Sequence, residues 1–180
     1  MRRYILFSLI LSSLLLTSCA SDRPVMIVKE TAHDYEKLAL EHYNSGDFEN
    51  AIKNFEKALE ENRKVSNLPG ISSDLYNLAR CYINFGLYDN AQKLLEEAQE
   101  INTVSEDKSR LADCYLLLAT IRIRKKEYDE ALRLLEKSYS LYQDDKNKKG
   151  TANALNNMGS IYIKKGDYET AQQNIESAVS

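Results

Sequence analysis

Apolar residues in this chain recur three and four positions apart from residue 32 onward, which is the spacing of one face of an α-helix. Leu75, Leu78 and Ala79 mark one such stretch, and Ala91 and Leu95 mark the next. A short polar segment separates the two stretches. The pattern therefore predicts pairs of amphipathic helices joined by tight turns.

The predicted helix pairs repeat every 40 residues, which is the interval between the alanines Ala51, Ala91, Ala131 and Ala171 and between the aromatics Phe48, Tyr88, Tyr128 and Tyr168. Gly46, Gly86 and Gly166 precede three of these aromatics in the turn, where glycine permits a positive φ. Lys126 stands at the corresponding position of the third copy. Gly70 and Gly150 are expected to precede the second and fourth copies.

These columns of aromatic, leucine, small residue and alanine resemble the tetratricopeptide repeat. The resemblance implies an all-α fold, a right-handed superhelical solenoid of about four helix-turn-helix units. We expect a repeat domain over residues 32–180, with copies at about 32–71, 72–111, 112–151 and 152–180. Because the period exceeds the usual value of about 34 residues, we expect longer second helices or longer loops.

The first 19 residues have the pattern of a secretory signal: Arg2 and Arg3, an apolar run over residues 4–16, then Leu16-Thr17-Ser18-Cys19. The apolar run would reach about 20 Å as a helix, short of a hydrocarbon core of about 30 Å. The last residues resemble the lipobox of bacterial lipoproteins, which implies removal of residues 1–18 and lipidation of Cys19 with a palmitate-type acyl chain. The alternative is an ordinary signal peptide cut near Ala20.

If Cys19 carries lipid, residues 19–31 form a tether that lacks a helical pattern and contains Pro24. Ala20 and Ser21 lack the aspartate that retains many lipoproteins in the inner membrane. By that resemblance we expect a lipid-anchored protein on the bacterial outer membrane, facing the periplasm.

Charge and composition exclude several other classes. The chain has 24 basic and 27 acidic residues, a net charge of -3, and no basic stretch of the kind that binds nucleic acid. Its mean hydropathy of -0.48 excludes a protein with many membrane spans. We therefore expect no nucleic-acid partner.

Residues that could support catalysis are sparse. His33 and His42 stand nine residues apart, whereas zinc ligands on one helix need a spacing of about four. The sequence has no glycine-rich phosphate loop and no nucleophile motif. We expect no metal, no cofactor and no enzyme activity. Cys81 and Cys114 either form a disulfide or are buried free thiols, and we favour the thiols.

In the tetratricopeptide repeat family, the inner face of each first helix lines a concave groove, and the same positions here carry amides, cations and a tyrosine. The predicted groove residues are Asn44, Tyr76, Asn77, Arg80, Asn84, Arg124, Asn157 and Lys164. The wider face adds Glu36, Tyr43, Leu116, Thr120, Ile123, Asn153, Asn156 and Ser160. Such residues offer hydrogen bonds to a peptide main chain and cations to a carboxylate, or they simply cover an exposed surface.

The resemblance favours a non-enzymatic, membrane-anchored adaptor for proteins of the cell envelope, such as an assembly scaffold for the outer membrane, pili or wall hydrolases. The alternative is a partner lipoprotein of a transporter that binds a solute or peptide, which predicts an enclosed polar pocket. The sequence ends at Ser180, within the last helix. We therefore expect Ile175 and Val179 to be partly uncovered and to support self-association.

Overall fold

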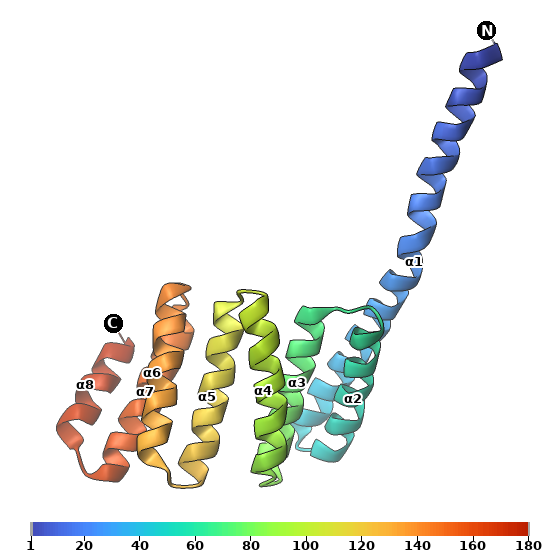
Figure 1. Ribbon diagram of the computed structural model, residues 1–180. Helices are drawn as coiled ribbons and strands as arrows, with labels where there is room; N and C mark the ends of the chain where they lie inside the picture. The colour runs from blue at the N-terminus through green and yellow to red at the C-terminus, as the bar shows by residue number, and fades with distance from the viewer. Residues whose placement is uncertain (1, 180) are drawn as a thin grey trace. The chain divides into compact units, whose positions relative to one another are not determined.

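The computed structural model describes the backbone of residues 2–179 and the side chains of residues 24–179. Figure 1 shows the eight helices of the described backbone as a ribbon. No strand occurs within that part of the chain. The helices belong to two units, residues 1–67 and 68–180, which are described separately below. The predicted all-α repeat fold is confirmed.

Unit 1 is a helix pair made of α1 (Arg2–Ser45) and α2 (Phe48–Lys64). Ala39 of α1 and Ala51 of α2 are fully buried, so the two helices approach closely. At the turn, the rings of Tyr43 and Phe48 meet edge to face, 5.4 Å apart. The carboxylate of Asp47 accepts a hydrogen bond of 3.2 Å from the backbone N–H of Asn50 and so caps α2.

The structure differs from the sequence prediction in the segment before the first repeat. Residues 24–31 were expected to form an irregular tether, but they are helical and continue into α1. Pro24 lies inside this helix, where it has no backbone N–H to donate and its ring crowds the carbonyl of the preceding turn. The side chain of Cys19 and the N-terminal residue Met1 lie outside the described residues. None of the helices described has the length and apolar character needed to cross a bilayer.

Unit 2 contains three further helix pairs, side by side along the chain in Figure 1. Its helices are α3 (Leu68–Asn84), α4 (Tyr88–Val104), α5 (Lys108–Arg124), α6 (Tyr128–Asp144), α7 (Lys148–Lys165) and α8 (Tyr168–Val179). Each odd-numbered helix packs most extensively on the helix that follows it, and α5 also contacts α3 and α7. The first helices of the three pairs are therefore neighbours on one face of unit 2.

The 40-residue period arises from helices of equal length. The helices α3 to α6 each have 17 residues, and three residues connect each of them to the next. The sequence predicted that longer second helices or longer loops would account for the long period. Instead, the first and second helices of a pair have the same length, and the connections between them are short. The first helices of unit 2 begin at Leu68, Lys108 and Lys148, four residues before the predicted repeat boundaries.

Polar caps mark the early starts of α5 and α7. The Asp107 carboxylate accepts a hydrogen bond from the backbone N–H of Arg110 at 2.9 Å, and the Asn147 side chain accepts one from Gly150 at 2.9 Å. The first turns of α5 and α7 are mostly polar and therefore escape a search for apolar periodicity. The helix α3 begins instead with Leu68, Pro69 and Gly70, and proline is tolerated in the first turn of a helix. Gly150, expected before its copy, lies inside the first turn of α7.

Small residues allow the helices of unit 2 to pack closely. Ala79, Ala91, Ala119 and Ala131 are fully buried and lie between the larger side chains of the core. Cys81 and Cys114 are buried free thiols, as favoured from the sequence. Burial raises the pKa of Cys81 to about 11 and that of Cys114 to about 12, so both thiols are protonated at neutral pH.

The turns inside the helix pairs need a left-handed residue in every copy. Gly46, Gly86 and Gly166 have φ values of 81°, 73° and 81°, and Lys126 has a φ of 63°. A residue with a Cβ atom is strained in this conformation by roughly 1 kcal/mol. Lys126 is exposed, and its backbone N–H donates to the Ile123 carbonyl at 3.0 Å, which holds it there.

Lys126→Gly is therefore expected to raise the free energy of unfolding by about 0.5–1 kcal/mol, because glycine removes the strain at positive φ. Equilibrium unfolding in urea measures the change. Lys126→Ala is the matched control, since it removes the same charge but keeps the Cβ atom. An equal gain in both variants would show that charge, and not backbone strain, is responsible.

Candidate functional site

Four of the predicted groove residues form a continuous stripe on α3. Tyr76, Arg80 and Asn84 follow at intervals of four residues, and Asn77 lies beside them. The Arg80 guanidinium lies over the Tyr76 ring, 5.9 Å from its centroid, and donates a hydrogen bond of 3.0 Å to the Asn77 side-chain oxygen. Arg80 is half-buried and held by its neighbours, which makes it a fixed cation on this face.

Equivalent positions near the ends of three successive first helices carry Asn84, Arg124 and Lys164, and all three side chains are exposed. Because α5 contacts both α3 and α7, these residues lie along one end of the same face. Together with Arg80, this end presents three cations. It is a suitable surface for a carboxylate.

The predicted asparagines are less available than the sequence suggested. The Nδ2 group of Asn84 donates to the carbonyl of Arg80 at 3.0 Å, and that of Asn157 donates to the carbonyl of Asn153 at 2.8 Å. These bonds run along their own helices. Asn44 is exposed on α1 and belongs to unit 1, so it is not placed with the others.

Glu36, part of the wider predicted face, turns out to serve packing within unit 1. Its Oε1 atom accepts a hydrogen bond of 3.2 Å from the Nδ2 group of Asn62 on α2. Since Asn62 is buried, this bond satisfies a polar group that would otherwise be costly to bury. The side chain thereby helps to join the two helices of unit 1.

A polar cavity of about 250 Å³ opens between α3 and α5. Its lining residues are Ser72, Ser73, Tyr76, Asn77, Asn102, Arg110, Asp113 and Cys114. Only Tyr76 and Asn77 were predicted from the sequence. The other residues come from the first two turns of α3 and α5 and from the end of α4, which the sequence placed near repeat boundaries. The polar cap at Asp107 was the available signal that α5 begins early.

Buried hydrogen bonds hold one wall of this cavity. The hydroxyl of Ser72 donates to the side-chain oxygen of Asn102 at 2.8 Å, and the Nδ2 group of Asn102 is 3.6 Å from the Cys114 sulfur, which accepts from it. All three side chains are buried. Buried polar groups that are paired in this way keep a fixed geometry.

Asp113 is the acidic group of the cavity. One of its carboxylate oxygens, Oδ1, accepts a hydrogen bond from the hydroxyl of Tyr142 on α6. Burial raises the pKa of the Asp113 carboxyl above its usual value, while the Tyr142 hydrogen bond and nearby Arg110 act in the opposite direction. Burial, followed by the Asp113 contact, also raises the pKa of Tyr142. The tyrosine is therefore a hydrogen-bond donor at neutral pH.

Arg110, the cation of the cavity, is already engaged. Its Nη1 atom donates to the carbonyl of Pro69 at 2.7 Å, and its Nε atom lies 3.5 Å from an oxygen of Asp107. Both contacts are within unit 2 and connect the starts of α3 and α5. The Arg110 guanidinium thus has a structural role. Asp113, by comparison, accepts one side-chain hydrogen bond, from Tyr142.

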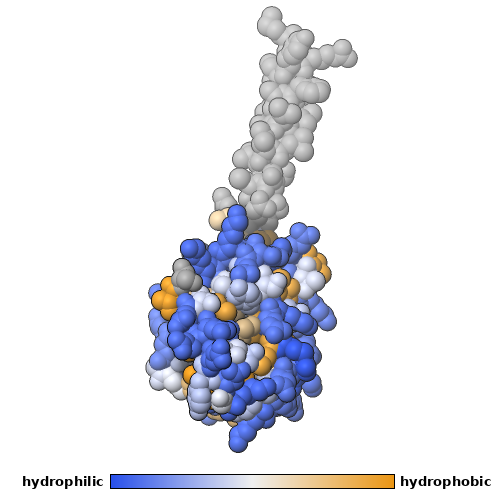
Figure 2. Space-filling model, turned by 90° about the vertical axis from the view of Figure 1, so that its left-hand side faces the viewer, coloured by the Kyte–Doolittle hydropathy of each residue, from blue (hydrophilic) through white to orange (hydrophobic). Residues whose placement is uncertain are grey.

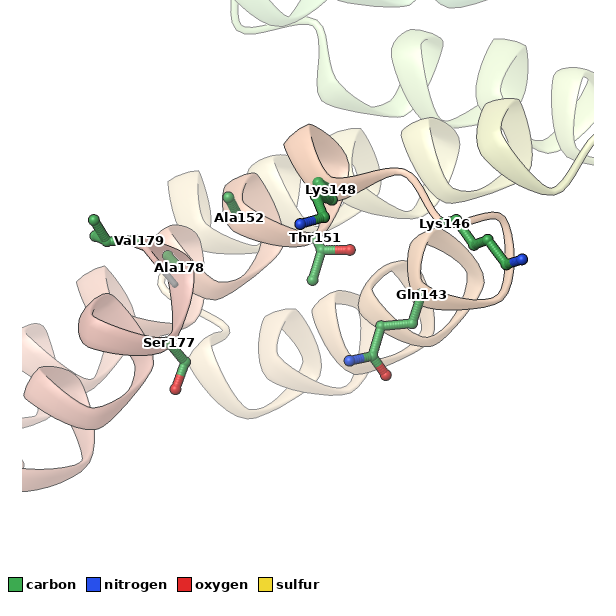
Figure 3. A pocket seen from close by; sticks show the side chains of 8 residues that line it. All are labelled: Gln143, Lys146, Lys148, Thr151, Ala152, Ser177, Ala178 and Val179. Carbon is green, nitrogen blue, oxygen red and sulfur yellow. The ribbon is translucent and has the colours of Figure 1, made fainter.

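A larger cavity of about 680 Å³ lies between α6, α7 and α8. Figure 3 shows the side chains around it, from Gln143 and Lys146 on one side to Val179 on the other. The side of the cavity formed by α8 consists of Ser177, Ala178 and Val179.

The end of unit 2 formed by α7 and α8 has a mixed surface. Figure 2 looks onto this end and shows separate hydrophobic patches among hydrophilic residues. Ile175 and Val179 are 38% and 84% exposed, as expected from the sequence. Within the described residues, no cluster of three or more histidine, cysteine or acidic side chains could hold a metal ion.

Known structures share this fold at low sequence identity. BtubC (BKLC) from P. vanneervenii aligns with a TM-score of 0.71 and 19% identity, over 82% of this chain and 61% of its own. The nearly identical TPR-like repeats of a Podosopora anserina kinesin light chain align with a TM-score of 0.66 and 20% identity, over 82% and 72%. Aspartyl phosphate phosphatase F from Bacillus subtilis gives 0.75 and 20%, over 93% and 44%. These similarities show the fold.

A search of curated protein sequences gave no match to this chain. The family model described as tetratricopeptide repeat matches residues 30–103, 73–144 and 110–180, which together cover the helix pairs of both units. The match agrees with the 40-residue period and the buried alanines. The chain therefore belongs to the tetratricopeptide repeat family.

Proposed function

We propose that this protein is a membrane-anchored adaptor that binds a protein or peptide segment of the bacterial cell envelope on the first-helix face of unit 2. Repeats of this family generally bind protein or peptide partners. The observation that carries the proposal is the alignment of Asn84, Arg124 and Lys164 at equivalent, exposed positions of three neighbouring helices. Catalysis has no part in this function.

The chemistry of the face suits a segment with a carboxylate. Arg80, Arg124 and Lys164 supply cations at one end, and charge-assisted hydrogen bonds to a carboxylate are stronger than those between neutral groups. The polar cavity between α3 and α5 adds a site where a side chain of the partner can be buried. An extended segment running between these features would contact α3 and α5 together.

Anchoring and location are proposed from the sequence. Lipidation of Cys19 after removal of residues 1–18 would hold the helix pairs at the outer membrane, facing the periplasm. A diacylated cysteine satisfies the requirement for more than one acyl chain in stable anchoring. Self-association through α8 stays a prediction of the sequence.

The triple variant Arg80→Ala, Asn84→Ala and Arg124→Ala is expected to lose at least tenfold in partner recovery, because it removes two cations and an amide from the face. Recovery is measured by cross-linking in intact cells, purification from the membrane fraction and mass spectrometry. In the same cells, Cys19→Ala should shift the chain out of the membrane fraction.

The control triple variant carries Asn90→Ala, Lys93→Ala and Arg133→Ala, a matched set of exposed residues on α4 and α6. It should recover the partner as the unmodified chain does. Equal recovery by both triple variants would reject the first-helix face as the binding surface. Recovery of a small molecule in place of a protein would support the alternative of a transporter partner.

A further inference from the structure

We propose that the cavity between α3 and α5 binds a basic side chain, lysine or arginine, of the partner, with Asp113 as the residue that recognises its charge. This inference rests on the proposed function and names the chemistry that the partner must bring. The observations behind it are the size of the cavity, the hydrogen bonding of Asp113 and the engagement of Arg110.

The size of the cavity favours a single side chain. Its volume of about 250 Å³ lies below the range of about 300–1,000 Å³ in which small-molecule ligands are usually enclosed. Tyr76 contributes an apolar wall, and Ser73 and Asn77 contribute polar groups nearby. A long side chain with an aliphatic stem and a polar end matches this combination.

The hydrogen bonding favours a cation. Oδ1 of Asp113 accepts from the Tyr142 hydroxyl, while Oδ2 accepts no hydrogen bond from the residues that the structure describes. The Arg110 guanidinium nearby is bound to the Pro69 carbonyl and to Asp107. A ligand carboxylate would therefore compete with existing partners of Arg110, whereas an ammonium or guanidinium group finds an open acceptor at Asp113.

The two ends of the face set a spacing within the partner. Asp113 and Arg124 both lie on α5, and the rise of about 1.5 Å per residue places them about 16 Å apart along the helix axis. An extended chain advances about 3.3 Å per residue. The partner segment should therefore carry a basic residue about five positions from an acidic side chain or terminal carboxylate.

The test uses N-acetyl-lysine methylamide as the probe, titrated into the full-length chain in detergent micelles and followed by backbone amide NMR. The amides of Ser73, Asn77 and Asp113 should shift and saturate. The comparison compound, with an acetyl group on the side-chain amine, has the same stem without charge and should bind at least tenfold more weakly. Equal shifts with both compounds, or none with the lysine compound, would overturn the inference.

Asp113→Asn should weaken lysine binding at least tenfold while leaving an acceptor for the Tyr142 hydroxyl. Asp34→Asn, an exposed residue on α1, makes the same change of charge and should bind as the unmodified chain does. Ser73→Lys places a tethered amine at the cavity and should prevent the lysine probe from binding. This variant provides the test if Asp113→Asn does not fold. Unchanged binding in folded Asp113→Asn or in Ser73→Lys would overturn the inference.

The outcome separates this inference from the proposed function. If lysine binding fails while the triple variant of Arg80, Asn84 and Arg124 still loses the partner, only the basic subsite is rejected. If the triple variant keeps the partner, the proposed function is rejected regardless of what lysine does. The two experiments share no variant.

Discussion

Leu135→Ala is expected to lower the free energy of unfolding by about 2–5 kcal/mol, the usual cost of truncating a large buried apolar side chain. Leu135 lies on α6 with 0% of its surface exposed. Removing its side chain takes apolar contacts from the core and leaves a cavity that the packed neighbours fill only in part. Urea unfolding followed by circular dichroism measures the loss.

Ile175→Ala is the matched control for Leu135→Ala. Ile175 occupies the equivalent position one repeat later, on α8, but it is 38% exposed. The same truncation should therefore cost distinctly less, because part of that side chain already contacts water. Equal losses of unfolding free energy in the two variants would show that Ile175 is as buried in the folded protein as Leu135.

Gly150→Ala is expected to lower the free energy of unfolding by about 1–3 kcal/mol, through overpacking. In an ordinary helix the same change would raise it by roughly 0.5–1 kcal/mol, because alanine loses less backbone entropy. Here a Cβ atom at residue 150 would overlap the ring of Tyr142. Tyr142 is buried and hydrogen-bonded to Asp113, so its ring has little room to move.

A double-mutant cycle isolates this clash. In a Tyr142→Ala background the ring is absent, and Gly150→Ala should then become neutral or stabilising. The unfolding free energies of the two single variants and the double variant are compared in urea. A loss of the same size with and without the ring would place the cause elsewhere in the first turn of α7.

The period of 40 residues predicted the number and pairing of the helices well, because residues three and four apart are neighbours on the same helix and need no distant partner. The turn glycines were predicted for the same reason. Lys126, which replaces one of them, keeps the positive φ of its column. The left-handed residues between pairs, Ser66, Glu106 and Lys146, were not foreseen, because nothing in their side chains requires that conformation.

The start of each first helix was predicted less well. The polar first turns of α5 and α7 and the Pro69-Gly70 pair in α3 give no helical apolar signal. The predicted boundaries therefore fell four residues late, and Gly150 was expected before its copy and not inside α7. Its role in packing depends on Tyr142, on the preceding helix. A contact of this kind is set by how α6 and α7 meet, which local periodicity does not specify.

The candidate site also has one part that the sequence predicted and one part that it did not. Tyr76, Asn77, Arg80 and Asn84 are one stripe of one helix, and helical geometry alone predicted that they share a face. The polar cavity could not be predicted in this way. Asp113 lies on α5, its hydrogen-bond donor Tyr142 on α6, and the opposite wall on α3. Short-range spacing determines which side chains one helix presents, whereas only the packing of helices far apart in the chain places a carboxylate beside a cavity and leaves one of its oxygens open.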